Sequence, residues 1–272
     1  SGIFTYSYSD MSIKRLIDSD DSGGDACLTS SGIYTTFKDS QRNLWIGSYT
    51  GGVSQVIFSK YPITFITHRH KERQSLVNDN VKSIAEGQDG SMWFATERGI
   101  SVYSPANRTW RHLLPGKVCV SLCRGNGGEM AVGTYASGIF VTDSKGNVTR
   151  HLTRQTDNIT SNYIFSIKKD TDGDYWVGSI DGDLMHLDSG WRLRRTYAVK
   201  QIFSFETLGK GRIAAATSDG FYIIDKRTGR IGHFASAKEQ MSKNVSAYII
   251  SMLFNNDHTV WLGTEGGGIL LY

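Results

Sequence analysis

One short pattern recurs six times along this chain of 272 residues. In each copy a Gly or Ala is followed by Ser or Thr, and in four copies a Trp stands two positions before that small residue. The small residues fall at positions 47, 95, 133, 178, 216 and 263, so successive copies lie 38 to 48 residues apart. A repeat of this length is typical of the blades of a β-propeller. The anchors of the six copies are Trp45, Trp93, Ala131, Trp176, Ala214 and Trp261.

Each copy has room for four short strands. About ten residues before the anchor, runs such as Val81–Ile84 and Ile164–Ile167 predict the first strand, and the anchor lies in the second. Turns rich in Asp, Asn and Gly separate these strands, and a glycine turn precedes the third. The fourth is more polar, as in Val148–Leu152 and Trp191–Arg195, and we expect it at the solvated outer edge.

The two ends of the sequence differ from the regular repeat. Residues 2–6 and 12–17 read as a third and a fourth strand, whereas residues 270–272 end within a third strand. The sequence therefore predicts an all-β fold, a single β-propeller domain over residues 1–272 with four-stranded antiparallel blades. It has six full repeats and an N-terminal strand pair, which fits a ring of six or seven blades. Without an initiator Met, we interpret the chain as part of a longer protein.

Composition excludes several other classes of protein. The chain has 30 Gly and only 3 Pro, and no apolar run approaches the roughly 18 residues of a membrane span. Its net charge of +4 is small, and no basic stripe interleaved with aromatic residues predicts nucleic-acid binding. For the basic run Arg192, Arg194 and Arg195 we favour a solvated outer strand over a polyanion-binding patch.

The turns between second and third strands are the candidate ligand-binding region. In a propeller these turns gather at one face around the central channel, where pockets are concave. They carry aromatic residues, carboxylates and one Arg, which suits a sugar that stacks on Tyr and bonds through its hydroxyl groups. The alternative is that these residues only cap their turns. The candidates are Tyr49, Glu97, Arg98, Tyr135, Asp181, Asp219 and Glu265.

No catalytic, cofactor-binding or metal-binding motif stands out. His68 and His70 fit a solvated loop better than a metal site, and the run from Asp170 to Asp174 resembles a calcium-loop opening without the required Glu. It also resembles the structural Asp-box turn of sialidases. The three cysteines are an odd set: Cys119 and Cys123 would be about 13 Å apart on one strand, too far for a disulfide, and we expect buried core thiols.

Two of the copies are similar to a known family. Residues 89–100 and 257–269, read with Asn80–Ile84, resemble the two-component regulator propeller repeat. The copies at Ala131 and Ala214 depart from it by losing the Trp. The resemblance implies a periplasmic, oligosaccharide-sensing region of an inner-membrane hybrid two-component protein. It implies adjacent sensor domains in the same chain, a homodimer in the full-length protein and a histidine kinase elsewhere.

Three functions therefore remain open. The first is a non-enzymatic sensor that binds oligosaccharide or a partner domain on its loop face, without a cofactor and without nucleic acid. The second is a carbohydrate-active enzyme on a propeller scaffold, a glycoside hydrolase or a polysaccharide lyase. It would need paired catalytic side chains at the mouth of the channel. The third is a protein–protein scaffold, which predicts an apolar patch on one face.

Overall fold

The computed structural model describes residues 2–7, 9–18, 28, 30, 32–57, 64–69, 72–209, 211–234, 248–255 and 259–272. The chain divides into two compact units, Ser1–Leu122 and Cys123–Tyr272. The sequence predicts a surface loop in the low-complexity segment 18–25. Asp18 is instead the last residue of a strand, and residues 19–25 lie outside the described residues. Among those described, no helix has the length and apolar character needed to cross a membrane.

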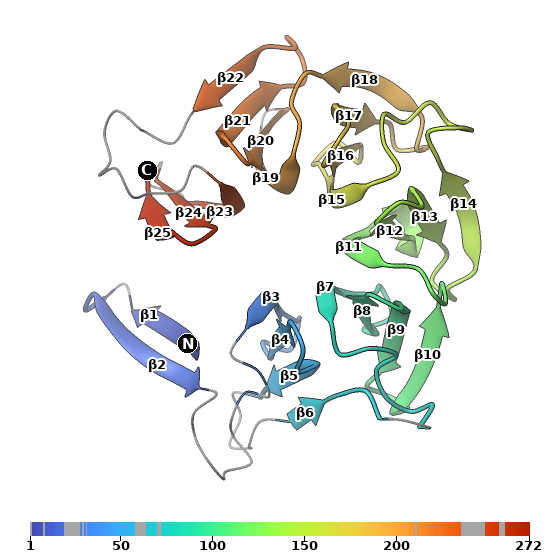
Figure 1. The fold of residues 1–272 in the computed structure, drawn as a ribbon, viewed down its shortest axis with the longest axis vertical. Coiled ribbons are helices and arrows are strands. Elements are labelled where there is room, and N and C mark those ends of the chain that lie inside the picture. The colour runs from blue at the N-terminus through green and yellow to red at the C-terminus, as the bar shows by residue number, and fades with distance from the viewer. Residues whose placement is uncertain are drawn as a thin grey trace. The chain divides into compact units, whose positions relative to one another are not determined.

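The first unit contains one hairpin and two four-stranded sheets (Figure 1). Its strands are β1 (Gly2–Ser7), β2 (Ser12–Asp18), β3 (Ile33–Lys38), β4 (Leu44–Ser48), β5 (Val53–Val56), β6 (Thr64–Ile66), β7 (Val81–Glu86), β8 (Met92–Thr96), β9 (Gly99–Ser104) and β10 (Thr109–Leu113). Strands β1 and β2 pair only with each other among the described strands, and β3–β6 and β7–β10 pair in chain order.

The second unit contains three four-stranded sheets and one of three strands. The first sheet contains β11 (Cys119–Arg124), β12 (Met130–Thr134), β13 (Ile139–Thr142) and β14 (Val148–Leu152), and β11 begins before the boundary of the unit. The second contains β15 (Ile164–Lys169), β16 (Tyr175–Ser179), β17 (Leu184–Leu187) and β18 (Leu193–Tyr197). The third contains β19 (Ile202–Gly209), β20 (Arg212–Thr217), β21 (Gly220–Asp225) and β22 (Ile231–Phe234). The last sheet is β23 (Ile249–Phe254), β24 (Val260–Thr264) and β25 (Gly268–Leu271).

Antiparallel pairing of chain neighbours in every described sheet is the blade pattern of a β-propeller, so the predicted fold class is confirmed. Five blades are complete, and the predicted N-terminal pair and C-terminal three-strand unit are both present. Within the second unit, Figure 1 shows β15 and β19 on one side of their sheets, and β18 and β22 on the other. The middle strands β16 and β17 are buried throughout, whereas β14 is mostly exposed.

The repeated anchor residues lie in the cores of the blades. Trp45, Trp93 and Trp176 are each at most 2% exposed, and Trp261 is partly buried. The small residue two positions later lets the next sheet approach closely. A Cβ built on Gly178 would lie 2.5 Å from Cγ2 of Ile202 at the start of β19, so a larger residue would clash.

The prediction for Trp191 was wrong in one respect. The sequence placed it in an outer strand, but β18 begins at Leu193 and Trp191 lies in the preceding turn with φ +67°. The turn is fixed by Asp188, whose carbonyl accepts the Trp191 N–H at 2.8 Å and whose carboxylate accepts the Arg192 N–H at 2.9 Å. Stacking on Tyr175, with ring centroids 3.7 Å apart, holds the indole in the core instead of on an edge strand.

Candidate ligand-binding site

A threonine hydroxyl at the end of several second strands shapes the turn that carries the candidate residues, whereas the buried hydroxyl of Ser48 in β4 has no hydrogen-bond partner among the described residues. Thr96, Thr134 and Thr217 each donate from Oγ1 to the carbonyl of the glycine that follows the turn, at 2.7 to 2.9 Å. All three side chains are fully buried. The Thr of these repeats is therefore a structural part of the turn, which leaves the side chains at the tip free to face solvent.

In the second unit these turns adjoin a continuous row of aromatic side chains, which we call the aromatic row. Tyr135, 50% exposed in the β12–β13 turn, meets the edge of Tyr163 at a centroid distance of 4.9 Å. The ring centroids of Tyr135 and Phe165 are 6.3 Å apart, those of Phe165 and Phe203 are 6.4 Å apart, and those of Phe203 and Tyr248 are 4.7 Å apart. The row thus runs across the first strands of three successive blades, and its members are Tyr135, Tyr163, Phe165, Phe203 and Tyr248.

Two predicted carboxylates lie beside the aromatic row. Asp181 accepts a hydrogen bond from the Ser161 hydroxyl, and the same hydroxyl accepts the backbone N–H of Tyr163 at 2.8 Å. Glu265 donates its backbone N–H to the Tyr248 carbonyl at 2.9 Å. Burial, with a contribution from the charge of Glu265, raises the pKa of Tyr248, so this phenol stays a neutral hydrogen-bonding group at physiological pH.

A third carboxylate, Asp219, is committed to its own turn. Its Oδ1 accepts from the Thr217 hydroxyl at 2.6 Å, and its Oδ2 accepts from the Tyr222 hydroxyl at 3.1 Å.

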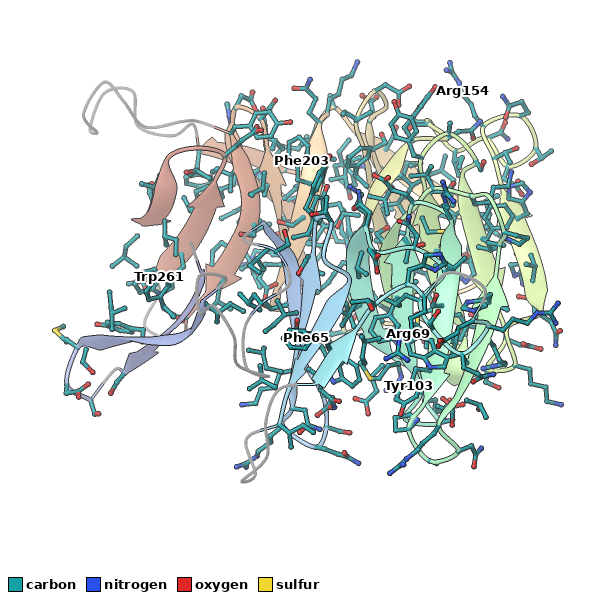
Figure 2. All side chains as sticks on the ribbon, turned by 60° about the horizontal axis from the view of Figure 1, so that its bottom comes forward. Phe65, Arg69, Tyr103, Arg154, Phe203 and Trp261 are labelled. Carbon is teal, nitrogen blue, oxygen red and sulfur yellow. The ribbon has the colours of Figure 1, made fainter. Side chains whose placement is uncertain are left out.

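Figure 2 labels Phe203 and Arg154, which lie toward the same end of the second unit. Arg154 follows β14, and its backbone N–H bonds the Asn162 side chain just before β15.

The first unit carries a compact group that we call the tyrosine–lysine cluster. Tyr34 and Tyr49 stack with ring centroids 6.2 Å apart at 20°. The ammonium of Lys82 lies 4.3 Å from the centroid of Tyr34 and 5.0 Å from that of Tyr49, and it pairs with Glu97 at 3.2 Å. The Lys82 side chain is only 11% exposed, so the cation is held between two ring faces and a carboxylate.

The seven predicted residues therefore do not all behave alike. The structure brings Tyr49 and Glu97 together in the first unit, and it places Tyr135, Asp181 and Glu265 beside the aromatic row in the second. Asp219 caps a turn. Arg98 is exposed, and its backbone rather than its side chain shapes its turn, with the N–H on Thr96 and the carbonyl on Gly116. Whether any of the seven binds ligand stays a prediction.

Sequence reasoning missed the residues that supply most of the aromatic surface. In four blades, a missed residue is the second residue of the blade's first strand. These residues of the tyrosine–lysine cluster and the aromatic row are Tyr34, Lys82, Phe165 and Phe203. A signal was present, since the same phase of the repeat carries a large side chain in most copies, but only the turns between second and third strands were considered. The missed residues are Tyr34, Lys82, Tyr163, Phe165, Phe203 and Tyr248.

At the opposite end of the second unit's strands, three carboxylates surround one lysine. Lys226 Nζ lies 2.9, 2.6 and 3.3 Å from carboxylate oxygens of Asp170, Asp172 and Asp174. Burial favours the neutral amine, but these carboxylates outweigh it and raise the Lys226 pKa. We call Lys226 and these three aspartates the carboxylate–lysine cluster. Asp170, Asp174 and His186 place ligand atoms within 4.8 Å of one another, yet the Lys226 ammonium already pairs with both of these aspartates.

The histidines and thiols of the described residues have structural surroundings. His68 Nδ1 lies 2.6 Å from the Leu76 carbonyl, while His70 is outside the described residues, so their pairing stays untested. Cys119 and Cys123 are free, and burial raises the pKa of Cys119 to about 12 and that of Cys123 to about 11. These thiols are poor nucleophiles at neutral pH. Cys27 lies outside the described residues.

Solved structures with the same fold come from several bacterial proteins. The extracellular domain assigned to the hybrid two component system BT3049 from B. thetaiotaomicron superposes with a TM-score of 0.80 over 96% of this chain, at 19% identity. This chain spans 36% of that domain. Virginiamycin B lyase from Staphylococcus aureus superposes with a TM-score of 0.74 over 98% of this chain and 85% of its own, at 13% identity.

A third neighbour is PorZ, a surface component of the type-IX secretion system of Porphyromonas gingivalis, with a TM-score of 0.66 and 17% identity over 87% of this chain and 38% of PorZ. No curated protein matches this chain in sequence. The family model described as the two component regulator propeller matches residues 27–50, 75–98 and 158–181. Each segment ends in the turn between the second and third strands of a blade, so three of the blades match the two component regulator propeller repeat.

Proposed function

We propose that this propeller is the ligand-sensing part of an extracytoplasmic two-component receptor and that it binds oligosaccharide along the aromatic row. The repeat family and the fold shared with the extracellular BT3049 domain support a sensor. The observation that carries the sugar proposal is the aromatic row itself, a run of ring contacts that continues across neighbouring blades with carboxylates beside it.

The chemistry of the aromatic row fits a carbohydrate better than a flat apolar ligand. Sugar rings present a C–H face that packs on aromatic rings and equatorial hydroxyl groups that need polar partners. Tyr135 offers half of its surface to solvent, and Asp181 and Glu265 offer carboxylate oxygens nearby. Pockets that combine a few polar groups with aromatic walls are the usual small-molecule sites.

The same surroundings favour binding over catalysis. Glu97 pairs with Lys82, Asp181 accepts a hydrogen bond from Ser161, and Asp219 is held by two hydroxyl groups. A glycosidase needs two carboxyl groups that flank the scissile bond, and each of these carboxylates is already engaged by a neighbouring side chain. We therefore propose a non-enzymatic sensor.

The wider context extends the proposal. We place the chain in the periplasm, as the sensor of an inner-membrane protein that continues into adjacent sensor domains and a histidine kinase, and that acts as a homodimer. An oligosaccharide on the aromatic row would signal by its different affinity for two arrangements of the receptor. This part of the proposal rests on the repeat family and on the extracellular neighbour.

The test is calorimetric titration of the purified protein with a panel of neutral oligosaccharides. Tyr135→Leu and Phe203→Leu remove ring faces of the aromatic row, and each should weaken binding about two- to tenfold, because stacking on one ring contributes about 0.5–1.5 kcal/mol. Tyr222→Leu is the matched control and should leave the affinity unchanged. Tyr222 is not a member of the aromatic row, and it stacks on His233 with ring centroids 4.2 Å apart.

Two results would overturn the proposal. The first is the absence of binding across the panel, or equal binding by the row variants and the control. The second is turnover: if a labelled glycan is cleaved and cleavage is lost in Asp181→Asn or Glu97→Gln, the chain is a carbohydrate-active enzyme. The variants should show unchanged thermal stability, so that loss of binding is not loss of fold.

A further inference from the structure

A pocket of about 650 Å³ lies in the second unit between the edge strand β14 and the turn that precedes the edge strand β18. Its walls come from two neighbouring blades. The lining shares no residue with the aromatic row or with the carboxylate–lysine cluster. We call it the arginine pocket, after Arg150 and Arg192, which line it from its two sides.

The inner part of the arginine pocket is apolar. Leu152 and Trp191 line it and are 4% and 3% exposed, and both belong to the core of the second unit. Two contacts fix the position of the Trp191 indole. Its ring stacks on Tyr175 at 3.7 Å, and its N–H points to Glu129 Oε2 at 3.4 Å. This floor is therefore rigid, and its one hydrogen-bond donor is already used.

Two guanidinium groups remain available at the mouth. Arg150 and Arg192 are exposed, and among the described residues neither forms an ion pair with a carboxylate. Asp188, in the same turn as Arg192, has its Oδ1 on the N–H groups of that turn and its Oδ2 on Arg194 at 3.3 Å. Those turn N–H groups, with help from the nearby arginines, lower the pKa of Asp188.

The remaining polar groups of the mouth are also committed. His151 stacks on Phe140 with centroids 4.0 Å apart, and its Nε2 lies 2.8 Å from the Ser137 carbonyl, so that nitrogen carries the hydrogen in the neutral ring. Asp157 accepts the backbone N–H of Thr153 at 3.1 Å and a hydroxyl from Thr156. The lining thus holds two guanidinium groups against the single carboxylate of Asp157, so its net charge is positive.

We infer that the arginine pocket binds a sugar acid, a uronate unit whose carboxylate is held between Arg150 and Arg192. Guanidinium groups recognise carboxylates through paired N–H donors, which makes arginine the suitable cation for a planar anion. A volume of about 650 Å³ with an apolar floor exceeds what a bare anion needs and suits a sugar ring or two. The inference gives a ligand-binding role to Arg192, which belongs to the basic run for which the sequence favoured a solvated outer strand.

The inference is independent of the proposed function because it concerns another place on the second unit. It is tested by titrating digalacturonate, its neutral counterpart galactobiose and inorganic sulfate into the wild-type protein and into the Tyr135→Leu protein, whose aromatic row lacks one ring. Arg150→Gln and Arg192→Gln should each weaken digalacturonate binding at least fivefold, and the double variant more. Arg154→Gln is the matched control, since it removes the same charge from an exposed residue that does not line the pocket.

The expected result is binding of digalacturonate, no detectable binding of galactobiose to the Tyr135→Leu protein, and less than twofold change in Arg154→Gln. Absence of digalacturonate binding would overturn the inference, as would equal losses in the control, which would show unspecific charge attraction. Sulfate that binds as tightly as digalacturonate would overturn the assignment to a sugar acid. The arginine variants should keep the wild-type melting temperature because both side chains are exposed.

Discussion

Single aspartates organise the turn before the second strand in two of the blades. Asp170 accepts the N–H groups of Asp172 and Asp174 on one oxygen, and the indole N–H of Trp176 at 3.2 Å on the other. Asp39 does the same for its own turn and bonds the indole of Trp45 at 2.8 Å. An acidic residue six positions before the anchor Trp thus links turn to core, which supports the Asp-box resemblance as a structural feature.

The stability of the carboxylate–lysine cluster should depend on pH in a defined direction. Burial favours the protonated acid at Asp170, but the hydrogen bond and charge of Lys226 and the Trp176 indole outweigh it, and the pKa falls below its ordinary value. A carboxyl group whose pKa is lower in the folded state stabilises the fold fully at pH values above its unfolded pKa, roughly 3.9. That stabilisation is lost as the pH falls through the folded pKa.

We therefore expect Lys226→Gln to lower the free energy of unfolding by about 1.5–3 kcal/mol at pH 7, the contribution of hydrogen bonds to charged groups. Urea unfolding at pH 7 and at pH 3 measures this, and the difference between variant and wild type should shrink at the lower pH. Lys200→Gln is the control, because Lys200 is 64% exposed and lies 4.0 Å from Asp183. Equal effects of the two substitutions would contradict the account.

Elements were predictable from the sequence where their signal is local. Strands β7, β15 and β23 begin at the predicted Val81, Ile164 and Ile249, because apolar alternation and turn residues lie within one repeat. Trp191 was misplaced because its position depends on Tyr175, a contact across the blade. The aromatic row was missed for the same reason, since its members are brought together only when successive sheets pack on one another.

Packing between sheets gives a prediction at Gly178. Alanine there places a methyl group 2.5 Å from Cγ2 and 2.7 Å from Cβ of Ile202, so β16 and β19 must move apart. We expect Gly178→Ala to destabilise the protein by about 1–3 kcal/mol, as overpacking does. Gly190→Ala is the control, since its Cβ would meet only one atom, at 3.3 Å in a surface turn. Thermal unfolding of both variants checks this, and equal melting temperatures would contradict it.

At the scale of the whole chain, the repeat was sufficient to predict the fold but not the binding chemistry. A period of 38 to 48 residues specifies one supersecondary unit used again and again. Ligand sites arise instead where one copy departs from the others. Arg150 in β14 and Arg192 before β18 line one pocket, and Trp191 lines the same pocket from a turn with positive φ.

Two sites on one molecule predict additive stabilisation. A ligand that binds only the folded state contributes about 2.7 kcal/mol at a hundredfold excess over its dissociation constant, and a chain of this size gains roughly 2–4 °C per kcal/mol. Because the arginine pocket and the aromatic row share no residue, a neutral oligosaccharide and digalacturonate should raise the melting temperature independently. Arg150→Gln should reduce only the second increment and Tyr135→Leu only the first. Shifts that fail to add, or that both vanish with one substitution, would show that the two ligands compete for a single site.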